Sequence, residues 1–107
     1  MSLDRYAACI EACYRCAKAC DHCATACLQE SDPKALADCI ALDIDCADVC
    51  RLGAAAMARG SEYVQAICEL CAGLCDACGR ECARHDHEHC RLCALACVRC
   101  AEECRRV

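Results

Sequence analysis

The sequence predicts an all-α fold, an antiparallel up-down four-helix bundle with a cysteine-lined core, in a single domain of residues 1–107. Glycine is scarce and proline occurs once, while Ala, Leu, Glu, Arg and Lys, all good helix formers, dominate outside the cysteines. The cysteines fall into four groups, and within each group successive cysteines are three, four or seven residues apart. This spacing places each group along one face of a helix, so four groups predict four helices.

The breaks between the groups carry residues that end and begin helices. The Ser-Asp-Pro run at 31–33 predicts a turn, an N-cap and a proline in the first helical turn. Gly60 is expected to end the second helix and Ser61 to cap the third, with Asp86 as the cap of the fourth. We therefore expect helices near residues 3–30, 33–58, 62–84 and 87–105.

Short connections make neighbouring helices antiparallel, so the residue numbers of facing positions have a nearly constant sum. Aligning the cysteine groups on this rule stacks the core into six layers. They are 27/36/85/87, 23/39/82/90, 20/43/78/93, 16/46/75/97, 13/50/71/100 and 9/53/68/104, and the far end is closed by Tyr6, Met57 and Val64.

Several functional classes have no support in the sequence. The formal net charge is -5 and there is no basic stripe for a nucleic acid. No run of about 18 apolar residues is present to span a bilayer. Asp4 and Glu11 lie where an export signal would need a cationic and then an apolar segment, so we expect a cytoplasmic protein. No nucleophile, base and orienting group converge, so we do not expect an enzyme.

Nineteen cysteines in 107 residues predict either a disulfide scaffold or a metal site. The odd number and the helical composition favour metal. Thiolates select soft ions, and a continuous ladder of bridging thiolates suits Cu(I) better than separate tetrahedral zinc sites. We expect multiple Cu(I) ions per chain, approaching one per thiol, on Cys9, Cys13, Cys16, Cys20, Cys23, Cys27, Cys39, Cys46, Cys50, Cys68, Cys71, Cys75, Cys78, Cys82, Cys90, Cys93, Cys97, Cys100 and Cys104.

Two further kinds of residue are candidate ligands. The layers place His85, His87 and His89 at the rim of the thiol column, where imidazole can capture entering or leaving ions. Asp43 occupies a core position opposite Cys20 and Cys78. A buried carboxylate is costly there unless it is hydrogen-bonded or bound to metal.

Over essentially its whole length the chain resembles the cytosolic branch of the bacterial four-helix-bundle copper storage proteins. The resemblance rests on the cysteine run from 9 to 27, on CIALDIDCADVC from 39 to 50, and on the two five-cysteine helices that follow. It implies a cytosolic homotetramer that holds Cu(I) on core thiolates and stores copper or buffers its toxicity. Apolar residues beside the stripes are expected to close helix seams or form a subunit interface: Ile40, Ile44, Ile67, Leu70 and Leu74.

Three alternatives remain open from the residues themselves. The first is a zinc or cadmium thiolate buffer of metallothionein type, which would bind ions in sets of four sulfurs. The second is a thiol redox protein, suggested by the repeated C-x-x-C steps, which requires an exposed cysteine of depressed pKa. The third is a purely structural bundle, but a core of cysteines packs poorly unless something occupies its centre.

Overall fold

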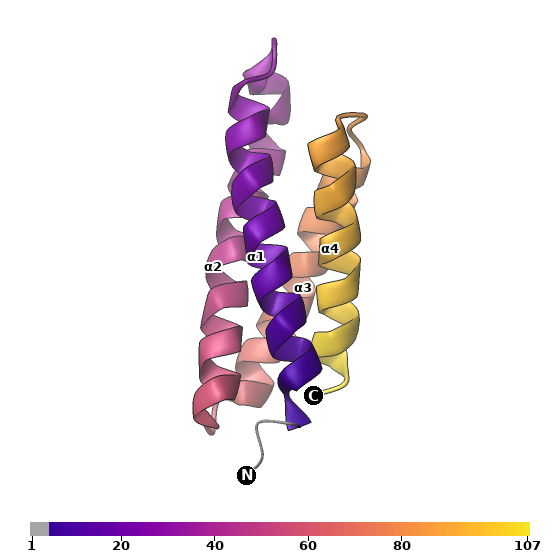
Figure 1. Ribbon diagram of the computed structural model, residues 1–107. Coiled ribbons are helices and arrows are strands. Elements are labelled where there is room, and N and C mark those ends of the chain that lie inside the picture. Colours follow the sequence, from indigo (N-terminus) through magenta and orange to yellow (C-terminus); the bar gives the residue numbers. More distant parts are fainter. Residues whose placement is uncertain (1–4) are drawn as a thin grey trace.

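The computed structural model describes residues 5–107, and over these residues it consists of four long helices joined by short connections (Figure 1). Helix α1 spans Ala7–Leu28, α2 spans Ala37–Arg59, α3 spans Val64–Ala83 and α4 spans Glu88–Arg105, with a 3-10 helix η2 at Pro33–Leu36. No strand occurs in the described part of the chain, and the predicted fold class is confirmed. The first residues of the helix expected from position 3 lie outside the described residues.

Two connections follow the turn chemistry of the sequence. Pro33 begins η2 instead of an α-helix, so the second helix starts as a tight turn and becomes α-helical only at Ala37. At the end of α2, Gly60 adopts the left-handed conformation with φ 66°, and its N–H donates to the carbonyls of Ala56 and Met57. Glycine reaches this conformation without steric cost, so the predicted end of α2 at Gly60 is confirmed.

Two expected helix caps are wrong. The residue preceding α3 is Tyr63, and Ser61 instead accepts a hydrogen bond from the Tyr63 N–H at 3.1 Å, which stabilises the turn before the helix. The residue preceding α4 is His87, in extended conformation and without a side-chain cap. Asp86 does not cap this helix; its backbone carbonyl accepts a hydrogen bond from the Arg91 guanidinium instead.

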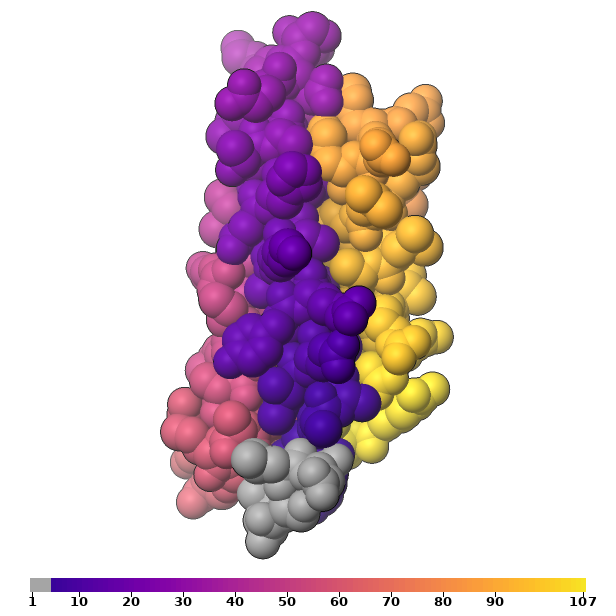
Figure 2. Space-filling model, in the orientation of Figure 1, coloured from indigo at the N-terminus to yellow at the C-terminus, as the bar shows by residue number. Residues whose placement is uncertain are grey.

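The helices form an elongated bundle of 48 × 17 × 17 Å in which α1 packs on α2 and α4, and α3 packs on the same two helices. The start of α1 and the end of α4 lie at the same end of the bundle (Figure 1). At the other end the connection between α1 and α2 projects beyond the connection between α3 and α4, as the space-filling view also shows (Figure 2). Within the described residues no helix has the length and apolarity needed to cross a membrane.

The core is a column of cysteines flanked by small residues and closed at one end. Tyr6, Met57 and Val64 are buried at the end where the chain terminates, as predicted. Along the side, Gly79 permits the close approach of α3 and α4, because a Cβ there would lie 3.2 Å from the Cβ of Cys97. Of the apolar residues beside the stripes, Ile40 and Ile67 pack against the core, whereas Ile44 and Leu70 are 50% and 54% exposed.

Candidate metal centre

All nineteen cysteines are buried and none is in a disulfide. Contacts of 3.3 to 4.0 Å link most of their sulfur atoms into three groups along the bundle, and sets of four sulfurs within 4.8 Å join these groups. The three predicted pairs between α2 and α3 are confirmed, at 3.3 Å for Cys39 and Cys82, 3.6 Å for Cys46 and Cys75, and 3.6 Å for Cys50 and Cys71. Neighbouring layers therefore share sulfur atoms and do not form separate sites.

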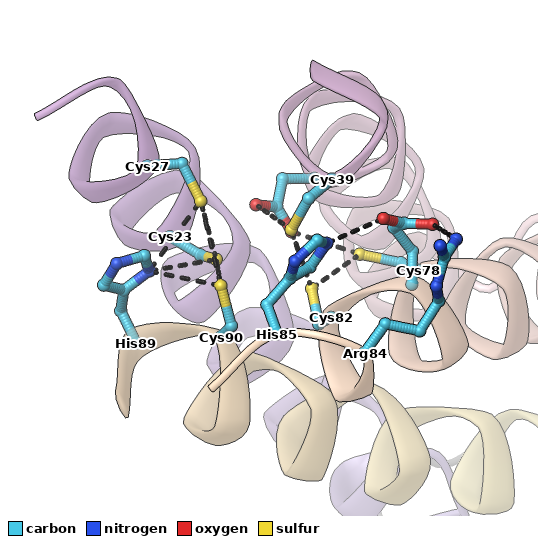
Figure 3. A network of polar contacts seen from close by, with 11 residues as sticks. Cys23, Cys27, Cys39, Cys78, Cys82, Arg84, His85, His89 and Cys90 are labelled. Atoms are coloured by element: carbon cyan, nitrogen blue, oxygen red, sulfur yellow. Dashed lines mark hydrogen bonds and ion pairs between the residues drawn. The ribbon is translucent and has the colours of Figure 1, made fainter. Parts of the chain in front are cut away.

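One histidine meets the thiols at the end near the α3–α4 connection. His89, at the start of α4, places its Nδ1 atom 3.5 Å from the sulfur of Cys23, 3.8 Å from that of Cys27 and 3.6 Å from that of Cys90 (Figure 3). Its Nε2 atom lies 2.8 Å from a carboxylate oxygen of Glu30. Donation from Nε2 to this carboxylate leaves the Nδ1 lone pair of the neutral ring directed at the thiols, as a metal ligand requires.

The other two histidines of the connection do not reach the thiols. His85 turns toward Glu81, with 2.8 Å between its Nε2 atom and the carboxylate (Figure 3). His87 stacks on His89 at a centroid distance of 5.3 Å, and its Nδ1 atom lies 3.4 Å from Glu30. The structure therefore brings one of the three candidate histidines to the thiols and leaves two beside carboxylates at the surface.

Asp43 is the one fully buried carboxyl group among the described residues. Its Oδ1 atom accepts hydrogen bonds from the thiols of Cys78 at 3.1 Å, Cys93 at 3.2 Å and Cys82 at 3.6 Å. The predicted proximity to Cys78 is confirmed, whereas Cys20 contacts the sulfur of Cys93 at 3.6 Å. Asp43 therefore supplies an oxygen atom in the middle of a sulfur cluster.

Farther along the bundle two cysteines act as centres of contact. The sulfur of Cys16 lies 3.8 to 3.9 Å from four other sulfur atoms, those of Cys20, Cys46, Cys75 and Cys97. The sulfur of Cys50 also lies 3.6 to 3.9 Å from four sulfur atoms, those of Cys46 and Cys75 again and those of Cys71 and Cys100. A thiolate at either position can therefore bridge metal ions in neighbouring layers.

The column ends near the chain termini, where Cys104 lies 3.7 Å from Cys9 and 4.0 Å from Cys13, measured between sulfur atoms. Cys9 was expected to face Gly53. In the structure a Cβ at Gly53 would lie 3.7 Å from the sulfur of Cys13, so the glycine leaves room for the neighbouring layer as well.

Burial is the main cause of the raised pKa at two thiols of the histidine end and at the core carboxyl group. It raises the pKa of the Cys27 thiol to about 11, and it also raises the pKa of Cys90. Burial and the facing thiols of Cys93 and Cys78 raise the pKa of Asp43 to about 12. These groups are therefore neutral at pH 7, as expected for charges that have no counter-ion in a low-dielectric core.

His89 is subject to opposing effects. Burial lowers its pKa, but the Cys23 thiol and the Glu30 carboxylate outweigh this effect, so the pKa is raised. The hydrogen bond to His89 in turn holds the pKa of Glu30 below its usual value. No motif or spacing in the sequence selects Glu30, which lies just beyond α1 and far from the histidines in the chain.

Several overlapping sets of four thiols have all their sulfur atoms within 4.8 Å of one another. Cys16 and Cys46, for example, belong both to a set with Cys50 and Cys75 and to a set with Cys20 and Cys97. Overlap of this kind suits ions that share bridging thiolates, and it does not divide the column into independent tetrahedral sites.

Comparison with known proteins agrees with this geometry. A family model described as "Copper storage protein" matches residues 2–107. A cysteine-rich protein of Bacillus subtilis, YhjQ, is 54% identical over 81% of this chain and 82% of its own length. The solved structure of a Cu(I)-bound copper storage protein, BsCsp3, is 54% identical and aligns with a TM-score of 0.91 over 94% of this chain and 95% of that chain. A cytosolic copper storage protein from Streptomyces lividans, described during copper loading with five coppers, is 49% identical, with a TM-score of 0.92 over 96% and 91% of the two chains.

Proposed function

Because this chain belongs to the copper storage protein family, we propose that its thiol column is the place where it stores copper. The cargo is Cu(I), held as many ions per molecule on the core cysteines, and the role is storage and detoxifying sequestration. One observation carries the proposal: nineteen cysteines are free and buried, and most of them have sulfur contacts of 3.3 to 4.0 Å with other cysteines of the column. Storage is not an enzymatic activity, and the column needs no catalytic group.

The connectivity of the sulfurs favours Cu(I) over zinc. Tetrahedral zinc with four thiolates of its own would limit nineteen cysteines to about four ions. Cu(I) is a soft ion that accepts bridging thiolates, so shared sulfurs can hold nearly one ion each. Each Cu(I) ion also balances the charge of one thiolate, which makes a loaded column neutral and therefore tolerable in a buried core.

The proposed ligands are the nineteen cysteines, with His89 and Asp43 as additional donors. His89 is supported by its short distances to three thiols, and Asp43 by its burial among cysteine sulfurs. His85 and His87 contact Glu81 and Glu30 instead of the thiols, so for them we propose an accessory role, in which they supply imidazole at the rim of the thiol column.

The test is an anaerobic titration of the reduced protein with Cu(I) in competition with a chromophoric chelator. The proposal requires an endpoint that approaches the cysteine count, with every ion bound tightly. An endpoint of a few ions, or a preference for zinc with four sulfurs per ion, would contradict the proposed storage of Cu(I) and favour a zinc buffer.

A pair of variants tests the bridging role. Cys46→Ser removes a thiol shared by two four-sulfur sets, whereas Cys9→Ser removes one at the end of the column. If thiolates bridge, the first variant loses more than one ion from the endpoint and the second loses at most one. Equal losses would show that each thiol serves one site alone.

We also place the chain in the cytoplasm and in a homotetramer. A relative from Streptomyces lividans is described as cytosolic, which supports the first assignment. Three apolar residues of α4, Leu92, Leu95 and Val98, are 57%, 68% and 56% exposed, and this exposed apolar surface supports the second assignment. Sedimentation of the purified protein measures the subunit number directly, and a monomer at all concentrations would contradict it.

A further inference from the structure

The thiols of the column are not equally covered. Four of the nineteen cysteine residues have any exposed surface: Cys9 and Cys104 are 3% exposed, and Cys68 and Cys75 are 1% exposed. At the histidine end, by contrast, the outermost thiols of Cys23, Cys27 and Cys90 are 0% exposed. The least covered cysteines therefore lie at the end opposite the histidines and along the side formed by α3 and α4.

A surface groove between α3 and α4 leads to two of these thiols. Its lining includes Cys68, Ala72 and Gly73 of α3 and Cys104 and Arg105 of α4. Gly73 borders open space, because a Cβ at that position would meet no atom within 4 Å, so a large side chain there would extend into the groove. Because Cys104 and Arg105 are the last residues of α4, the groove lies toward the end of the bundle where the chain terminates.

A second groove follows farther along the same pair of helices, where Cys75 lies beside Gly79 and Val98. The guanidinium group of Arg105 lines the first groove and is bound to the carboxylate of Asp76, which lines the second. The partly exposed cysteines outside α1 are Cys68, Cys75 and Cys104, and all three lie on the α3–α4 side. The ion pair of Arg105 and Asp76 joins the two helices between the two grooves.

We propose that the groove at Cys68 and Cys104 is an exchange site, at which a small thiol compound withdraws Cu(I) from the column. This proposal rests on the storage function. The histidine end, where no thiol is exposed, then serves entry through His89, and the two processes occur at opposite ends of the bundle.

The exchange needs no oxidant or reductant. The sulfur of the incoming thiol forms a bond to Cu(I) at the end of the column as the bond from the Cys104 thiolate to the same ion breaks. The proton lost by the incoming thiol is taken up by the Cys104 thiolate, and copper remains Cu(I). Each further step passes an ion toward the opening by the same replacement of one thiolate by another.

The groove favours a slim sulfur ligand. The two cysteines that line the groove, Cys68 and Cys104, are at most 3% exposed, so only a small ligand whose sulfur atom is sterically unhindered can approach them. The lining carries one cation, Arg105, and one anion, Glu69, so charge alone does not choose the ligand. The soft sulfur atom and its small size therefore determine the selection.

The test compares two substitutions at Gly73 in the full-length, copper-loaded protein. Gly73→Leu fills the groove, while Gly73→Ala brings the same gain in helix propensity without the bulk. Both variants are first titrated to their Cu(I) endpoint. Copper is then withdrawn with reduced glutathione under anaerobic conditions and its arrival at a chromophoric chelator is timed.

We expect Gly73→Leu to release copper about ten-fold more slowly than Gly73→Ala, which corresponds to a barrier raised by about 1.4 kcal/mol. Ala19→Leu serves as a matched control, because Ala19 lines a groove beside His89 at the other end, and its rate should equal that of the wild type. Equal rates for the two Gly73 variants, or slowing by Ala19→Leu alone, would overturn the exchange site. A wild-type endpoint of only a few ions would instead overturn the storage function.

A second measurement needs no variant. Brief treatment of the copper-free protein with iodoacetamide, followed by peptide mass spectrometry, identifies the thiols that react first. The proposed site requires Cys104 or Cys68 to be labelled before Cys23, Cys27 and Cys90. Labelling that begins at the histidine end would contradict it.

Discussion

Replacing Asp43 by asparagine should stabilise the copper-free protein at neutral pH. Burial raises the pKa of Asp43 to about 12, so the folded protein keeps this carboxyl group protonated at pH 7. In the unfolded chain an aspartate has a pKa of about 3.9 and is ionised at pH 7. Folding must therefore take up a proton, and the free energy of unfolding falls as the pH rises above the unfolded pKa.

The size of the effect follows from the pH interval. Below about pH 3.9 both states hold the proton, so Asp43 contributes no pH dependence there. Between that value and pH 7 the penalty grows by about 1.4 kcal/mol per pH unit, which amounts to at most about 4 kcal/mol. An asparagine is neutral in both states and has nearly the same shape. Its Oδ1 atom can keep the hydrogen bonds from Cys78 and Cys93, so the substitution removes the penalty and retains the contacts.

Urea denaturation of the reduced, copper-free protein, followed by far-ultraviolet circular dichroism at several pH values, measures this difference. Asp43→Asn should match the wild type near pH 4 and exceed its free energy of unfolding increasingly toward pH 7. Asp45→Asn, on the exposed side of α2, is the matched control and should follow the wild type. Parallel pH curves for Asp43→Asn and the wild type would refute the assignment of a protonated carboxyl group.

Three further outcomes are expected. His89→Ala should slow Cu(I) uptake about ten-fold in stopped-flow measurements, whereas His85→Ala should leave the rate unchanged, because only His89 meets the thiols. Chelator competition should show the apparent affinity for each Cu(I) falling about ten-fold per pH unit below neutrality, since every bound ion displaces about one thiol proton. In urea denaturation, Gly79→Ala should destabilise the copper-free protein by about 1–3 kcal/mol by crowding Cys97, while Gly73→Ala should stabilise it by about 1 kcal/mol.

The register of the bundle was predictable because each helix buries one stripe and the connections are short. Steps of three and four residues fix the buried face, and a short connection leaves one antiparallel alignment that keeps two stripes together. The contacts between Cys39 and Cys82 and between Cys23 and Cys90 follow from these two constraints alone. Gly60 was equally predictable, because a left-handed residue at a helix end is nearly always glycine.

Features that depend on individual side-chain directions were not predictable in this way. The layer arithmetic placed three histidines at the rim, but the hydrogen bond from His89 to Glu30 decides which imidazole faces the thiols. Asp is a residue type that commonly caps helices, yet α4 begins one residue later than this prediction requires, so that His87 and not Asp86 occupies the N-cap position. The unequal exposure of the cysteines likewise depends on packing and not on spacing, because α3 and α4 approach closely at Gly79 and leave open space beside Gly73.

The sulfur spacing of the copper-free column bears on how loading begins. A metal–thiolate bond of about 2.3 Å on each side of an ion spans up to about 4.6 Å between two sulfurs. The observed contacts of 3.3 to 4.0 Å, and sets within 4.8 Å, already lie near this span. An entering ion therefore displaces protons and moves side chains by about an ångström or less, without requiring the helices to rearrange. The fold does not depend on copper, because it is stabilised by helix propensity, by the helix end at Gly60 and by the buried cluster of Tyr6, Met57 and Val64. The bundle therefore offers the ion ligands that are already in place.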